Sequence, residues 1–287
     1  MNRYTLFSIF ILGATMVTPV IARAAIISVQ SDNAIAAGDT AIIDVYLDTE
    51  GEKVNVVDGS ITFGDVVPVR FVDLSVGGSP FTLWPRKPSL EANGKTISFV
   101  GGSPTSVQGS RVKIFSASVT PLAQGVLSVR QVSVTVFRAD GLGSSIAATV
   151  GNNSIAIGAK RSHPKDYLGE RLARDTEAPE KFSVEVSRDP SIAGGQRFLS
   201  FSSIDRESGI DYYTVIEKGY PEVRTGETYV LLNQDGKIHA TITAHDRAGN
   251  VRTVVYRDRS TLRIVLAGVI AIAVILGLIG IFRRLAR

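Results

Sequence analysis

Residues 125–137 read GVLSVRQVSVTVF, and this stretch decides the fold class. Within it, Val132, Val134 and Val136 occupy every second position, and Ser and Thr stand between them. A period of two places apolar side chains on one face of an extended strand and polar side chains on the other. The stretch therefore predicts a β-strand with one buried face and one solvated face.

The same alternation recurs elsewhere in the first half of the chain, for example in residues 40–49 and 111–120. β-Branched residues fill these runs, and Gly, Asn, Asp and Pro stand between them, as strands and turns require. Eight or nine short strands over residues 26–157, with no sustained helical period, predict a β-sandwich. The clearest turn-forming pairs are Asn93-Gly94, Gly101-Gly102 and Asp140-Gly141.

Residues 159–175 interrupt the strand pattern. Eight of these 17 residues are charged, and Pro164 lies among them, so we interpret the segment as an interdomain linker. Leu168 and Leu172 could form one face of a short helix within it. Strand alternation then resumes, and six or seven strands over residues 176–259 predict a second, smaller, immunoglobulin-like β-sandwich.

The two ends of the chain are hydrophobic and differ in kind. A basic residue, an apolar run and Ala22-Arg23-Ala24 predict that residues 1–24 are a signal peptide. Residues 262–282 are predicted to form a transmembrane helix, because residues 264–282 are uncharged and would span roughly 28 Å at ~1.5 Å per residue. Residues 283–287 would then be a cytoplasmic tail, with the bulk of a single-pass chain extracellular at the cell membrane.

Composition excludes several functions. The chain has no cysteine, which excludes disulfides, thiolate nucleophiles and cysteine-ligated zinc. Six of its 31 Lys and Arg residues lie outside residues 25–262, which leaves 25 there against all 27 Asp and Glu residues. This excess of two acids argues against a nucleic-acid partner. No nucleophile elbow and no histidine cluster occurs, so we expect no enzyme, no catalytic residue and no cofactor.

Five stretches of the first sandwich form a recognisable set. They are Gly38-Asp39-Thr40, 57–63 (VDGSITF), 96–101 (TISFVG), 112–117 (VKIFSA) and 138–143 (RADGLG). Through these stretches the first sandwich resembles cohesin domains, which hold dockerin-bearing proteins on scaffolds or cell surfaces. The likeness covers about residues 25–158. One departure is residues 63–66, FGDV, where the family has Tyr-Asp-Pro after its third strand.

The resemblance implies a jelly-roll β-sandwich that receives the helices of a dockerin-like module on one sheet face. In cohesins an Asp on the third strand often takes part, and Asp58 stands at the matching position. The alternative is an exposed strand residue with no role. The jelly-roll shape is shared with some carbohydrate-binding modules, so a polysaccharide ligand stays open by analogy of fold.

The second half of the chain contains three further motifs, at residues 175–179 (DTEAP), 203–210 (SIDRESGI) and 244–250 (AHDRAGN). Through these motifs the second sandwich resembles immunoglobulin-like or fibronectin-like repeats of bacterial surface proteins. It implies a module that spaces or stiffens the chain and does not itself bind a partner.

Phe81 and Trp84 lie in a loop rich in Gly, Ser and Pro. As an exposed aromatic pair, they could stack on sugar rings or anchor a partner. The alternative is that Trp84 closes one end of the sandwich core, because a lone Trp is usually largely buried.

Two sets of acids suggest Ca²⁺ ligands without establishing them. Asp205 and Asp246 lie near Gly-containing turns and could share a Ca²⁺, but turn formation explains them equally well. Residues 233–237, NQDGK, lack the acid that a calcium loop needs six residues after its Gly, where Ile242 stands, so we expect a hairpin turn there. The sequence therefore assigns no metal site.

These features predict a membrane-anchored extracellular binding protein. Its cohesin-like domain would dock a partner protein that carries a dockerin-like module, with Asp58, Phe81 and Trp84 as candidate partner-binding residues. The first alternative is a surface module that binds polysaccharide. The second is a structural component of the cell envelope.

Overall fold

The computed structural model describes residues 24–64 and 66–258. The expected signal peptide, apart from its last residue, the expected transmembrane helix at 262–282 and the tail at 283–287 lie outside the described residues. Among residues 24–64 and 66–258, no helix has the length and apolar character needed to cross a membrane.

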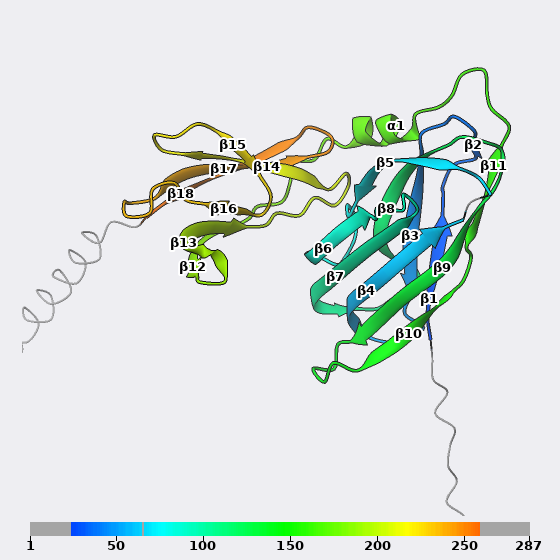
Figure 1. Ribbon diagram of the computed structural model, residues 1–287, viewed down its shortest axis with the longest axis horizontal. Coiled ribbons are helices and arrows are strands. Elements are labelled where there is room, and N and C mark those ends of the chain that lie inside the picture. The colour runs from blue at the N-terminus through cyan, green and yellow to red at the C-terminus, as the bar shows by residue number, and fades with distance from the viewer. Residues whose placement is uncertain (1–23, 65, 259–287) are drawn as a thin grey trace, which may run out of the picture.

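The first half of the chain forms one continuous hydrogen-bonded path of strands, in the order β5-β8-β3-β1-β10-β9-β4-β7-β6, with β11 joining β9 to β2. The path folds over on itself, so that β7 and β8 face each other across the core (Figure 1). Phe99 and Phe115 meet there with ring centroids 5.2 Å apart. The strands are β1 (Ala25–Gln30), β2 (Ile35–Ala36), β3 (Ala41–Asp48), β4 (Val54–Phe63), β5 (Val69–Ser75), β6 (Leu83–Leu90), β7 (Thr96–Val107), β8 (Val112–Pro121), β9 (Gly125–Arg138), β10 (Ser145–Val150) and β11 (Ser154–Gly158).

The all-β prediction is confirmed, but the strand count of eight or nine is too low, because the first half contains eleven strands. In two of these strands the sequence shows little alternation of apolar and polar residues. β2 has two residues, and β6 contains Pro85 and Pro88. Proline has no N–H to donate, so it is found on edge strands, and β6 ends the hydrogen-bonded path.

The charged segment after β11 folds onto the first sandwich. It contains helix α1 (Tyr167–Arg174), whose N-cap Asp166 accepts a hydrogen bond from the backbone N–H of Gly169 at 2.9 Å. Tyr167 is buried in the first core, and Thr40 forms a parallel β-bridge with Asp166. The helix is therefore held against the first sandwich. The chain continues from the end of this helix into the second sandwich.

The second half forms two smaller sheets, β12-β13-β16 and β15-β14-β17-β18. Their core contains Tyr213, which lies 5.1 Å from Phe201 between ring centroids. The hairpin expected at 233–237 is wrong, because that turn joins strands of different sheets; it is closed by Asn233 Oδ1, which accepts from Gly236 N at 2.8 Å. The strands are β12 (Val184–Asp189), β13 (Ile192–Phe201), β14 (Ile210–Glu217), β15 (Val223–Thr225), β16 (Thr228–Val230), β17 (His239–Asp246) and β18 (Val251–Arg257).

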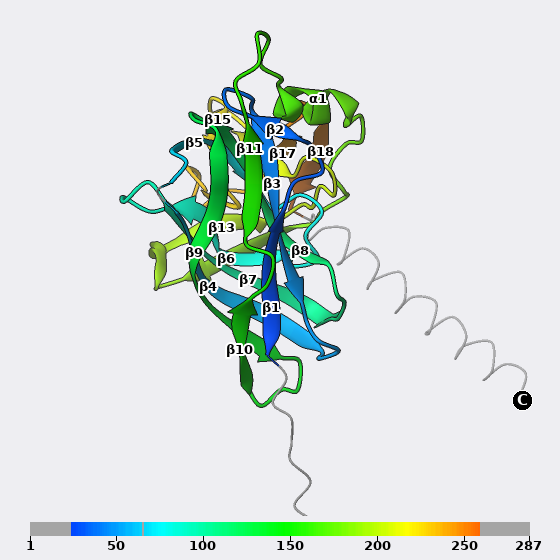
Figure 2. The ribbon, with the colours of Figure 1, turned by 90° about the vertical axis from the view of Figure 1, so that its right-hand side faces the viewer.

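The two sandwiches contact each other along β5. Ser75 Oγ donates to the carbonyl oxygen of Ser208 at 2.6 Å, and Arg247 donates to Asp73 Oδ2 at 2.9 Å and to the carbonyl oxygen of Leu74 at 2.7 Å. We call this set of contacts the joint. The end of β18 lies on the side of the second sandwich remote from the first, as Figure 1 shows. Figure 2 shows the first sandwich in front, with β1, β9 and β11 seen along their length.

Candidate functional site

Asp58 lies in the middle of β4 and is exposed. It is directly opposite Thr135 on β9 and Val100 on β7, and Val100 is opposite Arg86 on β6. Directly opposite residues of antiparallel strands share a face, so these four side chains form one row across four strands. Asp58 and Arg86, two strands apart, place opposite charges in that row.

The neighbouring row on the same face consists of four serines. Ser60 on β4 is opposite Ser133 on β9 and Ser98 on β7, and Ser98 is opposite Ser89 on β6. Ser89 and Ser133 are exposed, and the other two are half-buried. With strands ~4.8 Å apart, each row extends over roughly 14 Å. We call these two rows together the Asp58 face.

The Asp58 face is rich in hydrogen-bonding groups. Each serine or threonine hydroxyl can donate and accept, and an ionised Asp accepts only. Among residues 24–64 and 66–258, no ion pair or hydrogen bond given by the structure involves the Asp58 side chain. The carboxylate is therefore available to a donor from another molecule.

Phe81 does not form part of an exposed aromatic pair. Its side chain is 1% exposed and belongs to the core of the first sandwich. The loop around it is anchored by Ser79, whose Oγ donates to the carbonyl oxygen of Lys113 at 3.1 Å and accepts from Phe81 N at 3.3 Å. A side chain so fully removed from water contacts no partner, so the expectation for Phe81 is corrected.

Trp84 lies on the opposite side of the sheet from Asp58. Its ring covers Gly101, where an added Cβ would come within 2.7 Å of the indole, and Gly101 is opposite Val57, whose side chain is buried in the core. Trp84 is half-buried and also lines a crevice between the sandwiches, beside Lys87. The structure therefore does not bring the three predicted residues into one site.

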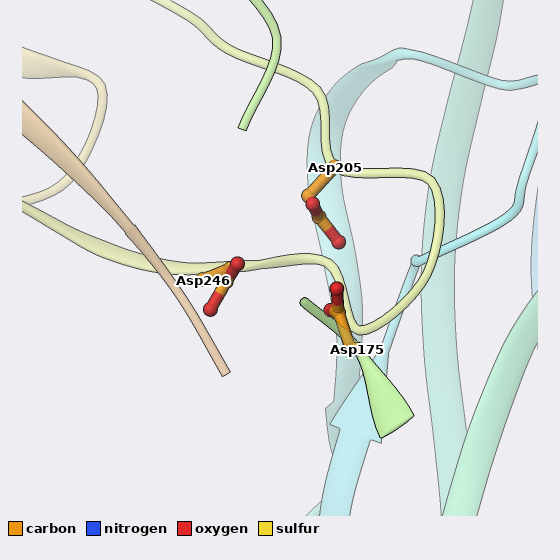
Figure 3. Close-up of side chains that lie close together, drawn as sticks. All are labelled: Asp175, Asp205 and Asp246. Carbon is orange, nitrogen blue, oxygen red and sulfur yellow. The ribbon is translucent and has the colours of Figure 1, made fainter. Parts of the chain in front are cut away.

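A second candidate site lies at the joint, where three aspartates converge (Figure 3). Asp175 is the C-cap of α1, Asp205 lies in the loop after β13, and Asp246 is the last residue of β17. One carboxylate oxygen from each lies within 4.8 Å of the others, and all three residues are buried. We call them the aspartate cluster.

Sequence reasoning singled out Asp205 and Asp246 but missed Asp175 and the serines of the Asp58 face. Asp175 begins the first of the three motifs used for the resemblance of the second sandwich, and each motif contributes one Asp to the cluster. That coincidence was a usable signal. The serine row could not be predicted from the sequence, because it depends on the register in which four strands pair.

Comparisons with known proteins give structural likenesses only. No protein-family model matches the chain, and no curated protein matches it. A cohesin module from a family 33 glycoside hydrolase of Clostridium perfringens is similar, with a TM-score of 0.38 and 10% identity over 48% of this chain and 98% of that one. The third ScaB cohesin of R. flavefaciens, in complex with a group 1 dockerin, is similar with a TM-score of 0.35 and 18% identity over 49% and 99%. At these values, neither likeness assigns a role to any residue.

Proposed function

We propose that the chain is a docking protein whose first sandwich binds a partner protein through the Asp58 face. The observation that carries the proposal is the exposed, uncompensated carboxylate of Asp58 beside a row of four serines. Such a face offers one strong acceptor surrounded by short side chains that can both donate and accept.

The partner on this proposal is a dockerin-like module that presents helices. A helix with its side chains is roughly 10–12 Å across, so a helix that lies along the strand direction fits within the ~14 Å length of each row. Short serine side chains let the partner approach closely, and Asp58 selects a Lys, Arg or helix N–H donor. Alternate strand positions set the specificity, because only they face outward.

The second sandwich is proposed to hold the docking face away from the membrane. Several contacts support a fixed arrangement of the two sandwiches, and the end of β18 is remote from the first sandwich (Figure 1). Export and anchoring rest on the sequence alone, through residues 1–24 and 262–282. Protease treatment of intact cells should cut the central region; complete protection of that region would contradict the surface location.

The docking proposal is tested by measuring binding of purified dockerin modules to the immobilised full chain. Asp58→Lys should weaken binding at least about tenfold. The substitution replaces the carboxylate acceptor with a positive charge, which repels a Lys or Arg donor of the partner. Glu91→Gln is the matched control: Glu91 is an exposed acid on the same sandwich and lies outside the two rows, so its loss should leave binding unchanged.

Two outcomes would overturn the proposal. One is unchanged binding by Asp58→Lys with a folded first sandwich. The other is retention of the full chain by insoluble polysaccharide while no dockerin module binds. A polysaccharide site usually presents several coplanar aromatic rings, whereas neither row of the Asp58 face contains an aromatic residue.

A further inference from the structure

The aspartate cluster places three carboxylates together inside the protein. Asp175, Asp205 and Asp246 are 6%, 6% and 3% exposed, and their nearest oxygens lie within 4.8 Å of one another. Figure 3 shows the three side chains directed toward a common point from three different segments. Like charges this close repel strongly once water is removed.

No described cation compensates this charge. The ion pairs among residues 24–64 and 66–258 include none of the three aspartates. Arg247 follows Asp246 directly, but its guanidinium donates instead to Asp73, to Leu74 O and to Ile210 O. Burial raises the pKa of Asp205, and the charges of Asp175 and Asp246 raise it further, against hydrogen bonds from the loop.

One oxygen of the cluster has no partner. Asp246 Oδ2 is buried and accepts no hydrogen bond within the described part of the chain, although Oδ1 of the same group accepts from Asn250 N at 2.8 Å. A buried, unpaired carboxylate oxygen is strongly unfavourable and is rare in folded proteins. A positively charged ligand would satisfy this oxygen.

The protein nevertheless fixes the carboxylates in place. Asp205 Oδ1 accepts from the backbone of Glu207 at 3.1 Å and of Gly209 at 2.7 Å. Asp175 Oδ2 accepts from Ser208 N at 3.1 Å, and its Oδ1 accepts from Glu177 N at 3.1 Å. These backbone donors orient the three groups without neutralising them, as the ligands of a preformed cation site are oriented.

We propose that the aspartate cluster binds a single Ca²⁺ ion. The donor set is entirely oxygen, which suits a hard cation, and the chain has no cysteine that would favour a softer metal. Two oxygens bound to one Ca²⁺ ion at roughly 2.3–2.6 Å lie no more than about 5.2 Å apart. The three oxygens of the cluster meet this limit, because they lie within 4.8 Å of one another. Three carboxylates supply up to six oxygens, and water completes the coordination.

The ion would act on the joint, independently of the docking proposal. Ser208 and Gly209 belong to the loop of Asp205, and Ser208 O accepts from Ser75 of the first sandwich. Asp175 ends the helix that packs on the first sandwich. Ca²⁺ therefore links the end of α1 to the two loops of the second sandwich that contact β5.

The test uses the purified full chain, freed of metal and titrated with CaCl₂ by calorimetry and thermal melting. We expect one saturable site and a rise in Tm of about 5–10 °C near one hundred times the Kd. Asp246→Asn, which keeps the acceptor for Asn250 N, should lose binding and the Tm rise. Without metal the same variant should melt above wild type, because one buried charge is gone.

Asp235→Asn is the matched control, because Asp235 is an exposed acid of the same sandwich, in the turn before β17 and at the opposite end of that strand from Asp246. It should bind Ca²⁺ like wild type. Asp175→Asn provides a second variant of the cluster with the same expected loss. The proposal is overturned if millimolar Ca²⁺ gives neither saturable heat nor a Tm shift, if MgCl₂ binds equally well, or if both cluster variants bind Ca²⁺ like wild type.

Discussion

Arg247 donates from Nε to Oδ2 of Asp73, 2.9 Å away, and so joins the two sandwiches through residues 174 positions apart in the chain. The same guanidinium donates to Leu74 O at 2.7 Å on the first sandwich and to Ile210 O at 2.8 Å on the second. Its side chain is 18% exposed. One planar group therefore satisfies acceptors on both sides of the joint, because its N–H donors are spread over three nitrogens.

Replacement of this arginine should loosen the joint. Arg247→Ala removes three charge-assisted hydrogen bonds, so we expect a loss of about 1.5–3 kcal/mol in the free energy of unfolding. The two sandwiches should then melt more independently, and calorimetry should show two transitions or one broader transition. Arg188→Ala removes an exposed arginine of β12 and should leave the melting profile unchanged.

The close approach at Gly77 provides an independent test of the joint. A Cβ at Gly77 would lie 2.6 Å from Glu207 O and 2.8 Å from Gly209 N, both backbone atoms of the second sandwich. Gly77→Ala should therefore push the sandwiches apart, with a larger radius of gyration in solution scattering and faster proteolysis near α1. Gly226→Ala, where a Cβ meets nothing within 4 Å, should change neither quantity.

The packing of Trp84 on Gly101 can be read by fluorescence, because the chain has one tryptophan. A Cβ at Gly101 would lie 2.7 Å from the indole, so Gly101→Ala should displace the ring toward water and shift its emission to longer wavelength. At Gly102 the nearest atom to an added Cβ is 3.7 Å away, an ordinary contact. Unchanged emission in Gly101→Ala, or an equal shift in Gly102→Ala, would contradict the packing of the indole on this glycine.

The aspartate cluster should give an unusual pH dependence in metal-free buffer. Burial raises the pKa of Asp205 in the folded state above its ordinary value of 3.8. The folded state then binds this proton more tightly than the unfolded state. The contribution to the free energy of unfolding therefore grows as the pH falls through the raised pKa, and it is fully present below 3.8.

Urea unfolding at a series of pH values should show this contribution as a difference between wild type and Asp205→Asn. As the pH falls, the free energy of unfolding of wild type should rise relative to that of Asp205→Asn, because the Asn side chain does not titrate. Asp175 and Asp246 face the same point and remain in both proteins. A difference that stays constant with pH, or moves in the opposite direction, would show that burial and repulsion do not act on Asp205 as the structure indicates.

Much of the strand content could be predicted from the sequence, because period two is a local property. Val134 and Val136 are buried on β9, and Ser133 and Thr135, which alternate with them, are exposed, as the alternation predicts. β2 was missed because two residues give no period. Helix α1 was foreseen as a possibility in the charged segment, but its packing against the first sandwich depends on Tyr167, which meets distant strands.

The sites were harder to predict, since they depend on contacts between distant residues. Asp58 was identified through the family resemblance, and its exposure could be expected from its place between buried Val57 and Ile61 on β4. Phe81 was misplaced because its surroundings of Gly, Ser and Pro are typical of surface loops, whereas its ring fills the core. The aspartate cluster joins residues far apart in the chain, so no spacing rule could assemble it.

The proline-containing strand β6 and the joint together determine how copies of the protein behave when crowded. The strand path of the first sandwich ends at β5 and at β6, and a bare terminal strand is a template for aggregation. Arg247 of the second sandwich occupies the carbonyl oxygen of Leu74 on β5, and Pro85 and Pro88 remove two donors from β6. Strand addition at β5 or β6 is therefore disfavoured, and dense arrays of the protein should not form cross-β fibres through these two strands.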